Sequence, residues 1–201
     1  MTGEKRTPPV APAQPGGRAP APGQLALVQA FINSHYSLED DRGAELWASP
    51  ASLQRWLRGR GLISSDARIG APERHRALTA REALRALAAR DRAPGARERV
   101  LDDLNAACAG AAVKLRFDDD GARFVRGGGG TFADALGLVM GITAGSMIDG
   151  RWDRMKICPG VHCGWAFYDA SRNGTGRWCS MSVCGGRAKA RAHYRRRQAV
   201  P

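Results

Sequence analysis

The chain has 201 residues, which is enough for one ordinary domain and a second small one. Its longest apolar stretch, at 136–148, is too short and too rich in glycine to cross a bilayer. No apolar segment follows Lys5 and Arg6, so the composition also excludes a secretory signal. We therefore expect a soluble, cytoplasmic protein, and in that compartment paired cysteines more often hold metal than form disulfides.

The formal net charge of +12 is concentrated in the last quarter of the chain. Residues 151–201 contain 11 Lys or Arg side chains and two acids, Asp153 and Asp169, a net charge of +9. This density indicates a polyanionic partner, with nucleic acid first and an anionic membrane surface second. A basic terminus can also serve only as a solubilising tail. The cysteine pattern beside it favours nucleic acid.

Composition divides the chain into three parts. Residues 1–23 are rich in Pro, Ala and Gly and lack the apolar side chains that offset ordering entropy, which predicts a disordered segment. Residues 24–150 predict a mainly α domain with a short β-hairpin. Residues 151–201 predict a small zinc-binding domain.

The first helices follow from apolar spacing and capping residues. Apolar side chains at 27–32 predict one helix. Ser49 followed by Pro50 predicts the start of the next, and a capping box at 79–82 predicts the start of a third. A fourth apolar face ends at Cys108, which we expect to be a small core residue rather than a nucleophile.

The apolar period then changes from that of a helix to that of a strand. Alternation over 113–117, a turn at 118–121 and a second apolar pair at 124–125 predict a β-hairpin. The glycine run at 127–130 is not followed by Lys and Ser or Thr, which favours a connector over a phosphate-binding loop. Thr131 then begins the last helix of this domain.

The most specific pattern is C-x4-C-x15-C-x4-C, formed by Cys158, Cys163, Cys179 and Cys184. Thiolates in two close pairs can converge on one tetrahedral zinc ion. Four cysteines close the coordination shell, so we expect the zinc to be structural. His162 is a weaker rival ligand, because neighbouring residues rarely reach the same metal. Two disulfides or redox-active thiols are the alternative.

The residues around the cysteine pairs predict a treble-clef-like zinc finger, with a knuckle, a β-hairpin and a basic helix in that order. A strand over 165–170, a turn at 173–174 and a return strand near 177–178 would form the hairpin. A helix from about 185 to 197 follows the second pair. A module of this size buries too little surface to fold alone, so metal binding supplies much of its folding free energy.

The string CPGVHCGWAFYDASRNGTGRWCSMSVCGGRAKAR, which starts at Cys158, resembles the CGNR zinc finger of bacterial transcriptional regulators. In that family an N-terminal helical domain named ABATE, described as a stress-induced transcription regulator, precedes the finger. The resemblance is weaker over 24–150, where LALVQAFINS (25–34) and ASPASLQRWL (48–57) are similar to the opening of that domain. The resemblance implies DNA binding. The Asn of the signature is here Gly186. If that Asn caps the helix, Gly replaces it at a cost of a few tenths of a kcal/mol; if it contacts a base, the contact is lost.

We therefore predict a DNA-binding transcriptional regulator whose basic helix lies along DNA. A spacing of four places Arg187, Arg191 and Arg195 in one stripe. The complete set of expected nucleic-acid contacts is Arg172, Arg187, Lys189, Arg191, Arg195 and Arg196.

Other functions are compatible with the same residues. An RNA- or ribosome-associated zinc protein would stack exposed Trp165, Tyr168 or Trp178 on unpaired bases. A zinc–thiolate redox sensor would lose its metal on oxidation. The sequence contains no Ser-His-Asp, H-E-x-x-H or G-x-S-x-G pattern, so we do not expect an enzyme. We expect nucleic acid rather than a membrane as the partner, because the basic segment adjoins the predicted metal site. The N-terminal domain would sense a ligand, dimerise or bind a partner protein.

Overall fold

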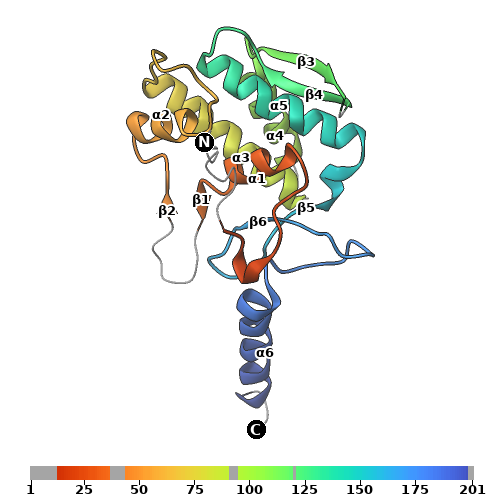
Figure 1. The fold of residues 1–201 in the computed structure, drawn as a ribbon. Helices are drawn as coiled ribbons and strands as arrows, with labels where there is room; N and C mark the ends of the chain where they lie inside the picture. Colours follow the sequence, from red (N-terminus) through yellow and green to blue (C-terminus); the bar gives the residue numbers. More distant parts are fainter. Residues whose placement is uncertain (1–12, 37–43, 91–94, 120, 199–201) are drawn as a thin grey trace, which may run out of the picture.

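The computed structural model describes residues 13–36, 44–90, 95–119 and 121–198 (Figure 1). These residues are mostly helical and contain three two-stranded antiparallel sheets. None of the helices in these ranges combines the length and hydropathy needed to cross a membrane. The elements, in chain order, are η1 (Pro15–Gly17), α1 (Leu25–Ile32), β1 (His35–Tyr36), β2 (Ala44–Glu45), α2 (Pro50–Arg58), α3 (Ala71–Ala89), α4 (Ala96–Cys108), β3 (Val113–Asp118), β4 (Gly121–Arg126), α5 (Phe132–Ile148), η2 (Arg151–Arg154), β5 (Met155–Ile157), β6 (Ala166–Tyr168), η3 (Met181–Gly185) and α6 (Gly186–Gln198).

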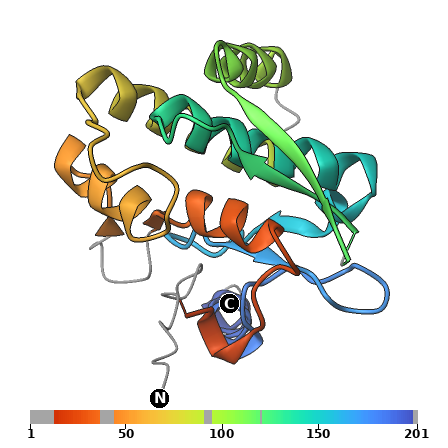
Figure 2. The ribbon, with the colours of Figure 1, turned by 45° about the horizontal axis from the view of Figure 1, so that its top comes forward.

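Helix α1 forms the centre of the hydrophobic core. All of its residues except Ala26 are buried, and it contacts α3, α5 and β6. Figure 2 shows it between α5 on one side and the strands β5 and β6 on the other. The ring of Phe31 packs edge-on against Trp47, with ring centroids 4.8 Å apart, and against Trp56 at 6.1 Å. A helix buried all round is typical of a core element shared by several layers.

Two helices begin where the sequence predicts. The Ser49 side chain accepts a hydrogen bond from the Ser52 N–H at the start of α2, and Pro50 is its first residue. The Thr131 side chain accepts from the Asp134 N–H at the start of α5. In both cases a hydroxyl satisfies a backbone donor that the helix itself leaves unpaired.

Helix α3 begins nine residues earlier than the capping box predicts, because its N-cap is Gly70 rather than Thr79. The residues 79–82 lie inside the helix, so that predicted start is wrong. The signals that mark the observed start are Pro72, in the first turn, and Glu73. The Glu73 carboxylate accepts a hydrogen bond from the Gly70 N–H at 2.8 Å. A capping box marks a helix start only where no stronger start signal precedes it.

The predicted apolar face of α4 is only partly buried, with Leu104 packed against the core. Within α4 only Ala96 and Ala107 are buried, Leu101 is exposed, and Cys108 is exposed rather than part of the core. The helix lies on the outside of the molecule and packs mainly on α3 (Figure 2). The expectation for Cys108 was wrong because helical spacing identifies a face without saying whether another element covers it.

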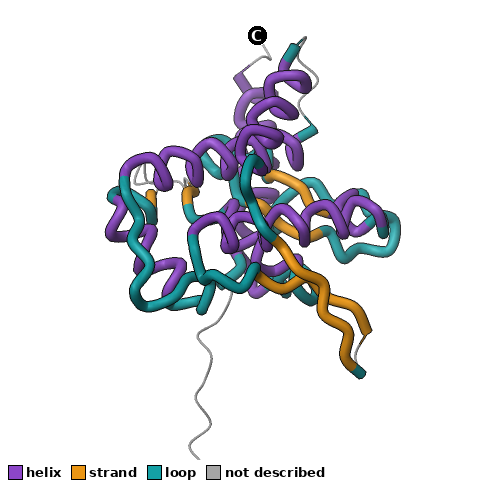
Figure 3. The backbone as a smooth tube through the Cα atoms, turned by 90° about the horizontal axis from the view of Figure 1, so that it is seen from above, coloured by secondary structure: helices purple, strands orange, loops and turns teal. Residues whose placement is uncertain are grey.

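The hairpin of β3 and β4 has the predicted position, with Asp118 paired to Gly121 at its turn. It lies along α5 and extends beyond the helical body (Figure 3). Three glycines of α5 at a spacing of four make room for it. A Cβ at Gly137 would lie 2.3 Å from the Ala112 carbonyl oxygen, and one at Gly145 would lie 2.6 Å from the Phe124 ring. The glycines therefore let the hairpin backbone approach the helix closely.

The part of the N-terminal segment that the structure describes is ordered, contrary to the prediction of disorder over 1–23. Gln14 and Ala21 are buried, and residues 15–17 form the short helix η1. Residues 1–12 lie outside the described residues. Polar contacts of Gln14, Arg18 and the Ala21 N–H, together with burial of Ala21 in the core, hold this segment in place, and composition does not reveal them.

Helix α1 is joined to β6 by buried amide side chains. The Asn33 Oδ1 accepts from the Ala166 N–H and its Nδ2 donates to the Ala166 carbonyl oxygen, both at 2.8 Å. The Gln29 Nε2 donates to the same carbonyl at 3.0 Å. Asn33 thus satisfies the outer edge of β6 as a neighbouring strand would, and it is fully buried.

Replacing Asn33 with Ala should lower the free energy of unfolding by about 2 kcal/mol, because the buried Ala166 N–H loses its partner. Asn105→Ala, at an exposed position of α4, is the matched control and should change stability by less than about 0.5 kcal/mol. Urea unfolding of the zinc-loaded proteins measures both. Equal stability of the two variants would contradict the role of Asn33.

Candidate metal centre and basic helix

The first cysteine pair lies in a knuckle that connects β5 to β6. These strands are antiparallel, with Met155 paired to Tyr168 and Ile157 to Ala166. The Cys158 N–H donates to the Trp165 carbonyl at 2.9 Å, which closes the loop. The first knuckle is therefore the loop of the β5–β6 hairpin.

The predicted return strand near 177–178 is absent from the described residues, and β6 pairs with β5 instead. A buried carboxylate explains why the chain after β6 forms a loop. Asp169 accepts from Lys156 Nζ at 2.7 Å, from the Gly176 N–H at 2.6 Å and from the Ser171 N–H at 3.1 Å. Burial alone would raise the pKa of Asp169, but these hydrogen bonds, led by the one from Lys156, hold it below its usual range. Arg172 is exposed at the turn of this loop.

The second cysteine pair lies at the start of a continuous helical segment. The Ser180 side chain accepts from the Val183 N–H and begins η3, which continues directly into α6. Gly186 has helical backbone angles, φ −60° and ψ −45°, so it does not cap the helix; Ser180 does. A Cβ at Gly186 would lie 3.5 Å from the Met181 carbonyl oxygen, an ordinary contact. The position can therefore hold a larger, exposed side chain such as Asn.

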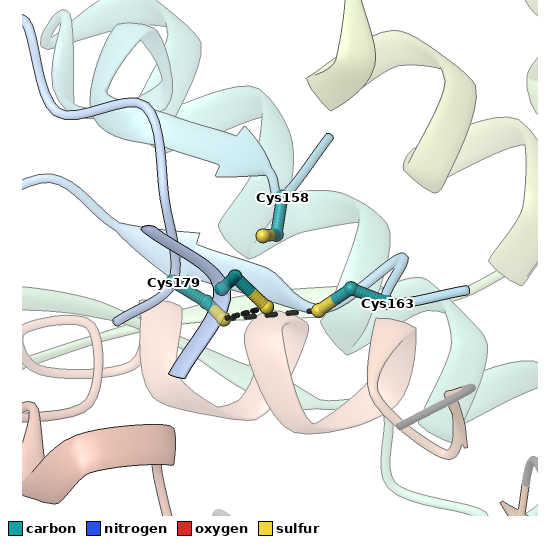
Figure 4. Close-up of side chains that lie close together, drawn as sticks. Cys158, Cys163 and Cys179 are labelled. Atoms are coloured by element: carbon teal, nitrogen blue, oxygen red, sulfur yellow. Dashed lines mark hydrogen bonds between the residues drawn. The ribbon is translucent and has the colours of Figure 1, made fainter. Parts of the chain in front are cut away.

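The sulfur atoms of Cys158, Cys163, Cys179 and Cys184 all lie within 4.8 Å of one another, and all four residues are buried. The Cys163 and Cys179 sulfurs are 3.7 Å apart, and those of Cys179 and Cys184 are 3.6 Å apart. Figure 4 shows the three labelled side chains pointing toward a common centre. Four thiolates at about 2.3 Å from a tetrahedral zinc ion are about 3.8 Å apart. The cluster therefore fits one zinc ion.

The backbone beside the sulfurs is packed as tightly as the sulfurs themselves. A Cβ at Gly160 would lie 3.1 Å from the Cys184 sulfur.

Four thiols held this close cannot all ionise on their own. Hydrogen bonds from Cys163 and Cys179 lower the pKa of Cys158 to about 2, and the bond to Cys158 raises the pKa of Cys163 to about 12. A divalent cation allows all four to be thiolates.

The alternative uses of the cysteines fit the geometry less well. All four are free, and the sulfur separations of 3.6 and 3.7 Å exceed the roughly 2.05 Å of a disulfide. His162 is exposed and has a left-handed backbone, with φ 58°, and it is not in the metal-binding group. The four cysteines are therefore the residues that would hold the zinc ion.

Helix α6 extends from this cluster away from the rest of the molecule (Figure 1). It contains six basic side chains, no acidic one and no buried residue, and it contacts the body chiefly through η3. Of the residues predicted to bind nucleic acid, Arg187 is half-buried, whereas Lys189, Arg191, Arg195 and Arg196 are exposed together with Arg172. The structure adds Tyr194 to this set of surface residues, because it is an exposed aromatic residue among the cations. Its position in the string HYRRR could have identified it from the sequence.

A closed four-cysteine zinc site followed directly by a basic helix defines a zinc-finger protein with one structural zinc ion. The family model of the CGNR zinc finger matches residues 154–197. That of ABATE, described as "Putative stress-induced transcription regulator", matches residues 10–149, more than half of the chain. The protein therefore belongs to the ABATE family and carries a CGNR zinc finger. No curated protein matches the chain. The family description is that of a regulator.

The Cys179→Ser variant should lose tight zinc binding, because Cys179 is fully buried and a hydroxyl is a poor zinc ligand at neutral pH. Cys108→Ser changes the exposed fifth cysteine and should keep one zinc ion per chain, as should His162→Ala. Metal analysis of the purified proteins gives the stoichiometry. Loss of zinc from the His162 variant would show that the ligand set is wrong.

Proposed function

We propose that this protein is a DNA-binding transcription regulator whose zinc site holds α6 in position for DNA. The observation that supports this most directly is the placement of six cations, with no acid among them, on a helix that projects from a rigid centre. A projecting basic helix fits the width of the major groove and can neutralise phosphates on either side of it. The family description as a transcription regulator supports the same function.

The proposed contact surface follows the stripe Arg187, Arg191 and Arg195. Successive members lie four residues apart and hence about 6 Å apart along the helix axis. Lys189 and Arg196 lie beside the stripe and extend it. Contacts with phosphate position a protein on DNA without reading its sequence. We therefore assign most of the affinity of this surface to the backbone of DNA.

Arg172 is proposed as a second contact, outside the helix. It is exposed in the loop after β6, and Asp169 fixes the shape of that loop through three hydrogen bonds. A preorganised loop loses little conformational entropy on binding, so an arginine on it can contribute at small cost.

We favour DNA over RNA because none of the three aromatic side chains expected to stack on bases, Trp165, Tyr168 and Trp178, is exposed, whereas Tyr194 of α6 is. Trp165 is 2% exposed and packs edge-on against Tyr36, with ring centroids 4.9 Å apart. It cannot stack on a base. Tyr168 and Trp178 are half-buried. Direct competition between duplex DNA and single-stranded RNA of equal length separates the two functions, and a clear preference for RNA would overturn the proposal.

The helical domain is proposed to receive the signal that the zinc finger transmits to DNA, within the cytoplasm. It shares its core with the finger, because Trp152, Met155 and Ala166 belong to the same cluster of buried residues as α1. A ligand or partner that shifts α1 would therefore shift β6, to which Asn33 and Gln29 are bonded.

The double variant Arg191→Ala/Arg195→Ala should bind duplex DNA more weakly at every salt concentration. If both side chains contact phosphate, the slope of log K against log salt should become shallower by about 2, since each contact contributes about 0.9. Fluorescence anisotropy with duplexes selected by the wild type from a random pool measures this slope.

The matched control is Arg97→Ala/Arg99→Ala, which removes the same charge from two exposed positions of α4. It should leave the slope unchanged, because α4 lies away from α6. An α6 variant with wild-type affinity and slope would exclude the stripe from the interface.

A further inference from the structure

The guanidinium group of Arg18 binds three backbone carbonyls of the zinc finger. Its Nε donates to Cys179 O at 2.9 Å, Nη1 to Tyr168 O at 3.0 Å and Nη2 to Trp178 O at 3.2 Å. The same group lies over the ring of Phe167, 4.8 Å from its centroid. One of the three acceptors belongs to a residue whose sulfur is in the metal-binding cluster.

We propose that residues 14–18, which we name the strap, complete the zinc site and that Arg18 is a positioning residue for the second cysteine pair. The strap ends 140 residues before Cys158, the first residue of the metal-binding cluster, and lies outside the matched zinc-finger region, 154–197. Figure 2 shows η1 beside the base of α6.

The need for such a residue follows from the fold of the finger. The first pair is held by the β5–β6 hairpin. The second pair follows the loop 169–178, which has no strand ladder. Tyr168 ends β6, Trp178 immediately precedes the second pair, and Cys179 is the first member of that pair. By binding all three carbonyls, Arg18 ties the rigid hairpin directly to the backbone of Cys179.

The strap is itself fixed at both ends, so that Arg18 is presented in one place. Gln14 is buried, and its Oε1 accepts from Gln29 Nε2 at 2.8 Å and from Trp165 Nε1 at 2.9 Å. Gly16 has φ +67°, and a Cβ there would lie 2.3 Å from the Ser180 hydroxyl oxygen. Only glycine allows the strap to approach the Ser180 cap this closely.

Hydrogen bonds from a charged donor are stronger than neutral ones, and partners that orient a ligand residue tune its metal affinity. Loss of such a partner typically lowers metal affinity by about 10- to 100-fold. Arg18 also brings positive charge to a zinc–tetrathiolate centre whose net charge is negative. Its removal should therefore speed zinc release.

The test measures zinc release from the full chain to a chromogenic chelator under native conditions, for Arg18→Gln, Arg18→Lys and a control. The control is Arg76→Gln, which removes an arginine that also binds carbonyls, those of Ala107 and Ala109, but in the helical domain. Arg18→Gln should release zinc roughly 10- to 100-fold faster than the wild type. Arg18→Lys should be intermediate, because one ammonium group cannot reach all three acceptors. Arg76→Gln should match the wild type in release.

The absorption spectrum of Co²⁺-substituted protein is the second readout, because it reports the arrangement of the four sulfurs rather than stability. The thiolate-to-cobalt bands should shift in both Arg18 variants and not in Arg76→Gln. If Arg18→Gln does not fold, the comparison of Arg18→Lys with the control decides. Wild-type release and an unshifted spectrum in Arg18→Lys would overturn the proposal, as would equally fast release from Arg76→Gln.

Discussion

Four buried thiols within 4.8 Å of one another are the constraint on which the functional end of this molecule depends. The hydrogen bond to Cys158 raises the pKa of Cys163 to about 12, so the four thiols cannot all be ionised without a cation. A zinc ion would remove that conflict and join the β5–β6 knuckle to Cys179, at the end of the following loop, and to Cys184 in η3. Because η3 continues into α6, we propose that metal coordination sets the direction of the basic helix.

The zinc finger does not stand apart from the helical domain. Amide side chains join them: Asn33 and Gln29 of α1 bind the backbone of Ala166. Such buried polar contacts are strong only when every partner is present, and they define a single arrangement of the elements they join. A regulator needs this kind of coupling, since a signal received by one part must alter the other. Here the shared element is α1, which packs against α3, α5 and β6.

Local signals predicted much of this structure, and long-range contacts account for what they missed. The cysteine spacing identified the four side chains that the fold brings together, and Ser49 and Thr131 marked their helix starts. The strand after the first knuckle was recognised, but its partner was not, because pairing depends on Asp169 binding groups up to 13 residues away. The order of residues 13–23 was missed for the same reason: Arg18 acts on residues at least 150 positions further along the chain. Local sequence patterns, which span a few residues, cannot reveal contacts over such distances along the chain.

That zinc positions α6 for DNA is tested most directly by titrating zinc into metal-free, reduced protein while DNA binding is measured. Salt is held constant, so charge alone cannot change the affinity. The account predicts that DNA binding rises in proportion to zinc and saturates at one ion per chain, with helicity and binding recovering together. Metal-free protein that binds the same duplex with the affinity and salt slope of the zinc-loaded form would contradict it.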